Sequence, residues 1–327
     1  MSKKIFFAAA VVFLFCMFAW VAFPVTSQAQ DLVKARLFIG TTPQFSAIFV
    51  AENKNYFREF GVDMEVKVFT SGSAAAEAFR AGKGEFVNAG DWPTTKLWER
   101  GDAIGIAPFV YFTKMSCITA KNGLSKPSDL KGKNVGVFLG STSEYFALLY
   151  MASEGLSFNN INVKNLRPAD MVYALDRGDI DAFVIWEPFC TQSINNVSKD
   201  KVHLMSYGAG YFTEWQVQCV SPAFAKENPK AVEGVLKALN KANKFIKDHP
   251  DETVKIVAKR LKLDESVMKE LLPRMTFDLS YTKAFRNDMN SLSKFMLDKK
   301  VLDKPIDWKT AFDSSFLKKV DPSLVEE

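Results

Sequence analysis

Hydrophobic and polar residues alternate between positions 63 and 69, where two valines and a methionine are separated by charged residues. This period of two predicts a strand with one buried face and one exposed face. Just before it, residues 45–60 carry apolar side chains at helical spacing, and Gly61 supplies a C-terminal stop. A helix followed by a strand is therefore the first unit that the pattern predicts.

The same change of period continues along the chain. Strands are predicted at residues 36–40, 63–69, 85–89, 104–110, 115–120, 134–138, 163–166 and 182–185. Helices are predicted at residues 45–60, 73–81, 141–154 and 169–177, and after Pro222 at residues 229–249, 251–261 and 264–272. Strands that alternate with helices build mostly parallel sheets covered by helices on both faces, so we expect an α/β protein.

Two segments of the chain resemble each other around Gly82 and Gly178. In each segment a predicted helix stops at the glycine, an acidic residue opens a short strand, and a second acidic residue follows that strand. These second acids are Asp91 and Glu187. Internal similarity of this kind predicts two lobes built on one plan. The alternative is a chance likeness between two ordinary helix–turn–strand units.

The N-terminal residues have the anatomy of a secretory signal peptide. Lys3 and Lys4 precede an uncharged apolar run over residues 5–23, and Pro24 ends that run. Small residues then lead to a cleavage point after Ala29. We therefore expect residues 1–29 to be removed and the protein to be exported to the periplasm. The alternative is an uncleaved membrane anchor, because the apolar run nearly reaches the length that spans a bilayer.

Charge and composition narrow the classes of partner. The chain has 42 Lys and Arg against 37 Asp and Glu, a formal net charge of +5, and cleavage would remove two of the lysines. So small a positive charge does not indicate a nucleic-acid partner, although it is compatible with collecting anions. No long apolar run follows Phe23, so the mature body is expected to be water-soluble, and a monomer is the default expectation.

The cysteines and histidines give no sign of a metal or cofactor site. Cys117, Cys190 and Cys219 remain after cleavage, and none forms a C-x-x-C pair. Their odd number leaves at least one thiol without an intramolecular partner, and three buried thiols are the simplest expectation. His203 and His249 are the only histidines, and neither lies near a second metal-ligand type. We expect no cofactor, no metal and no catalytic cluster.

Two predicted helices begin with small hydroxyl residues. The first turn of a helix has unpaired backbone N–H groups and lies at the positive end of the helix dipole, so it is suited to bind oxyanions. Two such starts, one in each lobe, would face each other across a cleft, although ordinary N-capping is the alternative for each. The candidate residues are Ser71, Gly72, Ser73, Ser141, Thr142 and, one turn further on, Tyr145.

Three tryptophans stand at predicted strand ends or loops among polar neighbours. A tryptophan in a cleft can wall a ligand or stack on it, whereas packing between lobes is the alternative. The neighbouring acids would orient loops or accept a hydrogen bond from a ligand amine. These candidates are Trp92, Trp186 and Trp215, together with Asp91, Glu187 and Gln216.

Four stretches of the chain together resemble one known family. They are residues 51–63, 71–93, 130–142 and 178–188, of which the last two, with Gly140-Ser141-Thr142 and Trp186-Glu187-Pro188, are the most specific. In these stretches the chain resembles the periplasmic binding proteins of the nitrate, sulfonate, taurine and thiamine-precursor ABC importers. The central stretches are most similar to the taurine and alkanesulfonate binders.

The resemblance implies a two-lobed periplasmic-binding-protein fold of type II, in which each lobe is a mostly parallel sheet flanked by helices. Lobe 1 would comprise residues 30–117 and 218–327, and lobe 2 would comprise residues 118–217. Two crossover strands near residues 115–120 and 216–221 would form the hinge. Because one cysteine falls in each crossover, the resemblance also suggests a disulfide between Cys117 and Cys219.

The resemblance also implies the ligand-binding residues. The helix starts at Ser71–Ser73 and Ser141–Thr142, with Tyr145, would hold the anionic head of the ligand. Gln44 and Trp186 would line the cleft.

Two positions depart from the taurine binders, and both point to a ligand other than taurine. Gln216 stands where those proteins have a carboxylate that pairs with the amine, and Trp92 stands where they have small residues. The function implied is capture of a small organic anion, with a sulfonate favoured, for delivery to the permease subunits of an ABC importer, without catalysis. The alternatives are a ligand-sensing periplasmic module and an enzyme of the thiamine-pyrimidine synthase type on the same fold.

Overall fold

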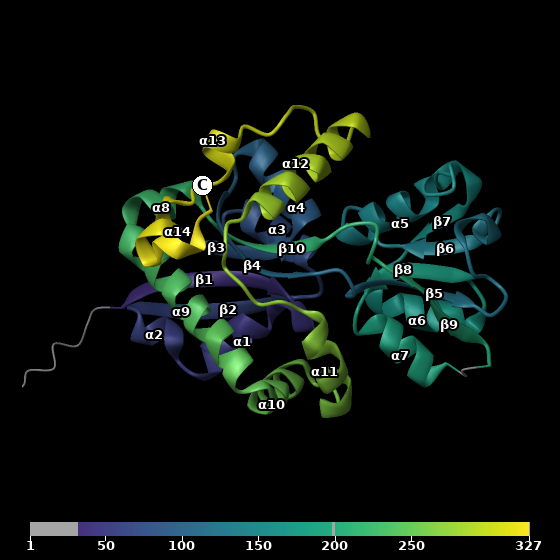
Figure 1. Cartoon of the computed structure of the whole chain (residues 1–327), viewed down its shortest axis with the longest axis horizontal. Coiled ribbons are helices and arrows are strands. Elements are labelled where there is room, and N and C mark those ends of the chain that lie inside the picture. Colours follow the sequence, from purple (N-terminus) through teal and green to yellow (C-terminus); the bar gives the residue numbers. More distant parts are fainter. Residues whose placement is uncertain (1–31, 198–199, 327) are drawn as a thin grey trace, which may run out of the picture. The chain divides into compact units, whose positions relative to one another are not determined.

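The computed structural model describes residues 32–197 and 200–326. The predicted signal peptide, residues 1–29, lies outside the described residues. Within them the strands form two sheets of five strands each, and helices flank both sheets (Figure 1). No helix in these two ranges is both long and apolar enough to span a bilayer.

The first sheet has the strand order β2-β1-β3-β10-β4. Its strands are β1 (Val33–Gly40), β2 (Val62–Phe69), β3 (Phe86–Gly90), β4 (Ile104–Phe112) and β10 (Glu214–Val220). β1 pairs in parallel with β2 and β3, whereas β10 pairs in the antiparallel sense with both β3 and β4. The helices of this half are α1 (Ser46–Asn53), α2 (Tyr56–Glu59), α3 (Gly72–Arg80), α4 (Asp91–Arg100), α8 (Pro222–Glu227), α9 (Pro229–Asp248), α10 (Pro250–Leu261), α11 (Glu265–Leu271), α12 (Lys283–Asp298), α13 (Trp308–Ala311) and α14 (Ser315–Val320).

The second sheet repeats this plan with the order β7-β6-β8-β5-β9. Its strands are β5 (Ser116–Lys121), β6 (Asn134–Val137), β7 (Asn162–Asn165), β8 (Ala182–Trp186) and β9 (Val202–Tyr207), and its helices are α5 (Thr142–Ala152), α6 (Pro168–Arg177) and α7 (Phe189–Asn196). β5 is the antiparallel strand here, paired with β8 and β9. Gly82 and Gly178 precede β3 and β8, which are the third strands of their sheets, so the predicted internal repeat is confirmed.

The chain passes between the sheets twice, along residues 113–115 and residues 208–213. The segments expected as crossover strands are instead β5 and β10, which are the antiparallel strands of the two sheets. Each enters its sheet directly after the passage. The expected lobe limits at Cys117 and Gln218 fall inside these two strands.

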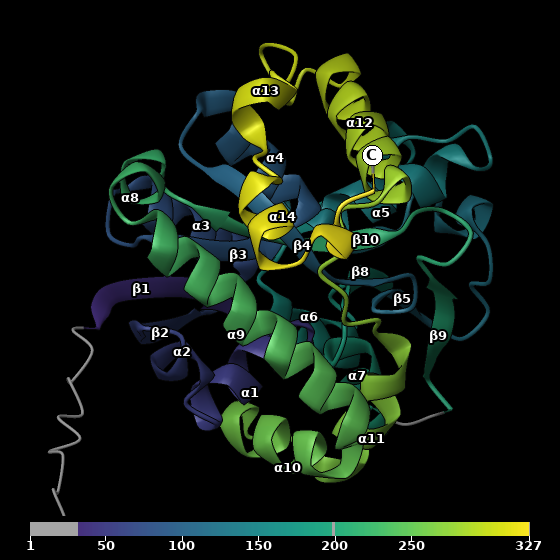
Figure 2. The ribbon, with the colours of Figure 1, turned by 60° about the vertical axis from the view of Figure 1, so that its left-hand side comes forward.

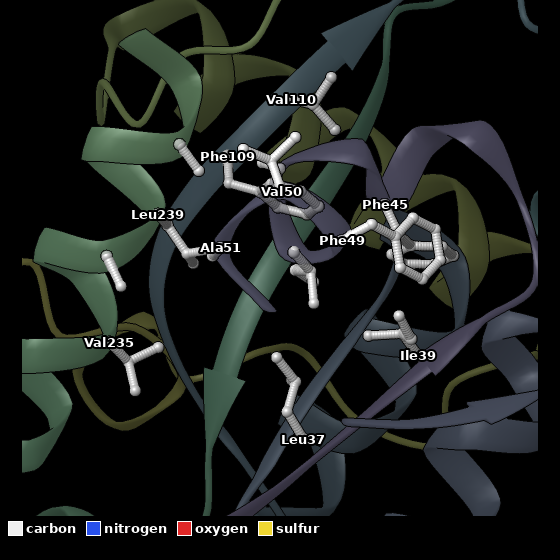
Figure 3. Packing of buried hydrophobic residues seen from close by; sticks show 14 of the residues in the cluster. Leu37, Ile39, Phe45, Phe49, Val50, Ala51, Phe109, Val110, Val235 and Leu239 are labelled. Atoms are coloured by element: carbon white, nitrogen blue, oxygen red, sulfur yellow. The ribbon is translucent and has the colours of Figure 1, made fainter. Parts of the chain in front are cut away.

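The core of the first half packs one face of its sheet against helices. Leu37 and Ile39 of β1 belong to the same buried cluster as Phe49 of α1 (Figure 3). α9 runs along α1 and α10 on the outside of this half (Figure 2). Its buried Val235 and Leu239 continue the same cluster, as their helical spacing predicts.

The single helix expected at residues 45–60 is wrong. α1 ends at Asn53 and α2 begins at Tyr56, because Asn55 between them adopts a left-handed conformation with φ of 58°. Asparagine tolerates this region better than most residues, so it can turn the chain where helical spacing of the apolar residues continues.

The disulfide suggested between Cys117 and Cys219 is also wrong. Cys117 of β5 is bonded to Cys190 of α7, and Cys219 is a free, buried thiol. Cys219 lies on β10 in the first sheet, whereas β5 belongs to the second sheet and packs against α7. The expectation of three buried thiols fails for the same reason.

Candidate functional site

A small cavity of about 30 Å³ lies where both halves of the chain meet, and we call it the head cavity. Its walls are Thr42, Gln44, Phe45, Gly72, Ser73, Gly90, Pro93, Ser141, Thr142, Trp186, Glu214 and Gln216. None of these twelve residues is Lys, Arg or His. A cavity of this size holds about one water molecule or a compact chemical group of similar size.

Three helices begin at the head cavity. α3 begins at Gly72, α4 follows Gly90, and α5 begins at Thr142, and each of these residues is part of the cavity wall. The positive ends of three helix dipoles therefore converge on one small space. The helices contain 9, 10 and 11 residues, long enough for each to have a complete first turn of free N–H groups. This arrangement attracts an anion without using a cationic side chain.

The two helix starts predicted from sequence are capped by their own serines. Ser71 Oγ accepts a hydrogen bond from Ala74 N at 3.1 Å, and Ser141 Oγ accepts one from Ser143 N at 3.2 Å. Ser141 Oγ also donates to the carbonyl of Phe138 at 2.6 Å. The capping hydroxyls fix the orientation of the helix starts, whose first residues Gly72 and Thr142 are part of the cavity wall.

Two hydrogen bonds join the halves beside the cavity. Ser73 Oγ of α3 donates to the carbonyl of Gly140 at 3.0 Å. Thr142 Oγ1 of α5 donates to Asp91 Oδ1 of α4 at 3.0 Å. This close approach requires a glycine at position 90, because a Cβ there would lie 2.8 Å from Thr142 Oγ1. The two halves are therefore already in direct contact around the site.

Several buried polar atoms in the cavity wall have no hydrogen-bond partner in the described part of the chain. They are Trp186 Nε1, Gln44 Oε1 and Gln216 Oε1. A buried polar group without a partner is destabilising, so these atoms fit a site whose partner is a ligand. Each glutamine amide can present either its oxygen or its nitrogen, whereas the indole can only donate.

Two buried carboxyl groups stand at the cavity. Glu214 in the wall accepts hydrogen bonds from Ser116 Oγ at 2.6 Å and from Gln216 Nε2 at 3.2 Å. Burial raises the pKa of Glu214 to about 8, and the negative charge of Asp91 adds to this rise. Burial likewise raises the pKa of Asp91 to about 7, although the N–H of Trp92 opposes this. Near neutral pH these groups can therefore be protonated.

The other residues predicted for the site do not line the head cavity. Trp92 packs on the ring of Tyr145 at 5.8 Å, and Trp215 lies 4.7 Å from the ring of Tyr111. Glu187 forms a buried ion pair with Arg274 at 3.0 Å. Packing and pairing of this kind stabilise the fold around the site. The predicted residues outside the wall are Ser71, Asp91, Trp92, Tyr145, Glu187 and Trp215; those within it are Gln44, Gly72, Ser73, Ser141, Thr142, Trp186 and Gln216.

Sequence reasoning missed five wall residues, which are Thr42, Phe45, Gly90, Pro93 and Glu214. One of these five residues, Glu214, could have been predicted from the sequence. Polar and apolar residues alternate from Glu214 to Cys219, which predicts a strand that places Glu214 on the same face as Gln216. A carboxyl group thus stands two residues before Gln216, on the same face of β10.

Two sheets of matching topology, with helix starts from both halves around one cavity, define the architecture of the periplasmic binding proteins. The alkanesulfonate-binding protein of Xanthomonas axonopodis pv. citri, solved bound to MOPS, matches the chain with a TM-score of 0.76 and 21% identity. The match covers 86% of this chain and 99% of that one. The chain therefore has a periplasmic-binding-protein fold, as predicted.

The family follows from the sequence match. The NMT1/THI5-like family matches residues 42–253, so the chain belongs to this family. A Bacillus subtilis protein named for binding aliphatic sulfonates is 27% identical over 296 residues, which cover 86% of each chain. The taurine-binding periplasmic protein of Escherichia coli is 26% identical over 247 residues, which cover 74% of each chain. The resemblance drawn from the sequence motifs is confirmed.

Proposed function

We propose that the protein is the substrate-binding component of an ABC importer and that it captures a small organosulfonate in the head cavity. The observation that carries this proposal is the convergence of three helix starts, from both halves of the chain, on a cavity the size of one compact group. The names of the relatives, which refer to sulfonate and taurine binding, support the same class of ligand.

The chemistry of the wall suits a sulfonate. Its three oxygens spread one negative charge, so several neutral donors can share it. Donors of this kind are the N–H groups at the helix starts and the indole N–H of Trp186. A ligand held by both halves stabilises their closed arrangement through the contacts that only this arrangement offers.

We further infer that the protein is exported, because relatives of similar length carry the word periplasmic in their names and residues 1–29 fit a signal peptide. The closed form would then be recognised by membrane permease subunits. The binding names of the relatives favour capture without turnover.

Calorimetric titration of the mature protein with methanesulfonate tests the proposal directly. We expect binding in the micromolar range, which corresponds to about −8 kcal/mol. Sodium chloride at equal ionic strength is the control for general anion effects. Absence of heat and of any thermal stabilisation with methanesulfonate, taurine and longer sulfonates would overturn the assignment.

Affinity for a simple sulfonate is expected to fall about tenfold between pH 6.5 and pH 9. The pKa of Glu214 is raised to about 8, so this group is mostly neutral at the lower pH and mostly a carboxylate at the higher one. An anion binds best beside the neutral form, and its affinity declines as pH rises through that pKa. Titration calorimetry across this range measures the slope.

Glu214→Gln is the matched variant for this pH effect, because it keeps the size of the side chain and cannot ionise. We expect its sulfonate affinity to fall much less between pH 6.5 and pH 9, because only Asp91, with a pKa of about 7, still ionises at the cavity. An aminosulfonate should behave in the opposite way with the unaltered protein, since its ammonium group pairs with the ionised carboxylate. A wild-type profile as flat as that of the variant would show that Glu214 does not face the ligand.

A further inference from the structure

A second and much larger cavity, of about 580 Å³, adjoins the head cavity, and we call it the tail cavity. Ser73 lines both cavities. Thr41 and Ser71 in the tail cavity are each next in sequence to a residue of the head cavity wall, Thr42 and Gly72. The two spaces therefore lie next to each other, with Ser73 in the wall that they share.

The two cavities differ in size and in chemistry. The head cavity holds little more than one compact group, and polar and apolar atoms contribute about equally to its surface. The tail cavity is many times larger, and apolar side chains supply most of its surface. Those apolar residues are Ala74, Phe138, Pro168, Ala169 and Phe189.

Aromatic rings connect the two spaces. Phe138 in the tail cavity packs edge to face on Trp186 in the head cavity wall, with ring centroids 6.2 Å apart. Phe189 adds a second ring on the same side and is only partly buried. Partly exposed rings that face a cavity offer edges and faces to a third ring. The wall thus favours a flat aromatic group over a flexible chain.

The charged residues at the tail cavity do not make it a second anion site. Arg167 is exposed and pairs with Asp170 at 2.8 Å, so its charge is already balanced at the rim. Glu77 likewise pairs with Arg80 at 2.7 Å. The electrostatic attraction for an anion thus remains at the helix starts of the head cavity.

We propose that the tail cavity holds the aromatic portion of the ligand, so that the protein takes an arenesulfonate, with its sulfonate in the head cavity and its ring against Phe138 and Phe189. This inference rests on the proposed function, because it places the rest of the same ligand. The occupant follows from the position of the tail cavity next to the head cavity at Ser73 and from the size of the head cavity, which leaves no room for a ring.

Titration of the mature protein with methanesulfonate, hexane-1-sulfonate and benzenesulfonate at pH 6.5 tests the proposal. Each buried methylene group is worth roughly a fourfold gain in affinity, so a buried ring should gain at least about thirtyfold over methanesulfonate. Benzenesulfonate should also bind more tightly than hexane-1-sulfonate, which has the same number of carbon atoms but a flexible chain.

Phe189→Ala is the variant that isolates the tail cavity. We expect it to lower benzenesulfonate affinity about tenfold and to leave methanesulfonate affinity unchanged, which also shows that the variant is folded. Tyr173→Ala is the matched control, because Tyr173 is an exposed aromatic residue of α6 that does not line the tail cavity. This control should change neither affinity.

Each alternative outcome has a distinct meaning. Methanesulfonate binding as tight as benzenesulfonate binding would overturn the assignment of the tail cavity to the ligand, while leaving the proposed function intact. Tighter binding of hexane-1-sulfonate than of benzenesulfonate would overturn the aromatic assignment. Equal loss of all three affinities in Phe189→Ala would show that Phe189 acts on the head cavity. Failure of every sulfonate to bind would overturn the proposed function and this inference together.

Discussion

Replacing Ser141 and Thr142 together by alanine is expected to weaken sulfonate binding by about a hundredfold. A hydrogen bond to a charged group contributes about 1.5–3 kcal/mol, and each 1.4 kcal/mol is a factor of ten in affinity. Thr142 loses the hydroxyl that joins α5 to Asp91 of the other half beside the head cavity, and Ser141 loses the cap that orients the N–H groups of α5. Both losses disturb the helix start that holds the sulfonate oxygens, so we expect both to lower the affinity.

Titration calorimetry at pH 6.5 measures this effect, and circular dichroism checks that the double variant is folded. Ser221→Ala is the matched control, because Ser221 caps α8 by accepting from Phe224 N at 3.3 Å and does not line the head cavity. Thr142→Ser keeps the hydroxyl and should retain most of the affinity. Unchanged affinity in the double variant would rule out the helix start of α5 as part of the anion site.

Reduction of the Cys117–Cys190 disulfide is expected to lower the free energy of unfolding by about 2–4 kcal/mol. The bond joins residues 73 positions apart and ties α7 to strand β5 of the second sheet. Without it the unfolded chain gains conformational freedom that folding must overcome. Urea denaturation with and without reductant, followed by circular dichroism, measures the difference.

Two variants control this experiment. Cys219→Ala removes the free thiol and should keep the full response to reductant, whereas Cys117→Ala with Cys190→Ala should lose it. Alkylation of the denatured protein without reductant should modify one thiol of the mature chain. Three modified thiols would contradict the disulfide.

The sequence determined the fold class because its signals are local. Alternation over residues 63–69 and helical spacing over residues 229–249 each depend on neighbours within a few positions, and both elements are found as β2 and α9. The repeat around Gly82 and Gly178 gave the matching sheets for the same reason. The prediction of an element was wrong where one residue changes the direction of the backbone, as Asn55 does between α1 and α2.

The helix starts at Gly72 and Thr142 were also visible in the sequence, since a cap is a property of a few adjacent residues. The sequence did not show which of the other polar and aromatic residues would lie beside these helix starts in the cavity wall. Trp92 and Trp215 have polar neighbours like those of Trp186, yet they pack against other rings while Trp186 lines the cavity.

Only the tertiary structure decided these matters. Glu214 reaches the cavity because β10 inserts between β3 and β4, which pairs Gln216 with Gly90 across more than a hundred positions of sequence. The partner of Cys117 was decided in the same way, by the packing of α7 on β5. Local periodicity predicts which face of a helix or strand is buried, but it does not predict which distant element packs on that face. The helices and strands that form the site of this protein could therefore be predicted from the sequence, whereas their arrangement around the site depends on the pairing of the strands.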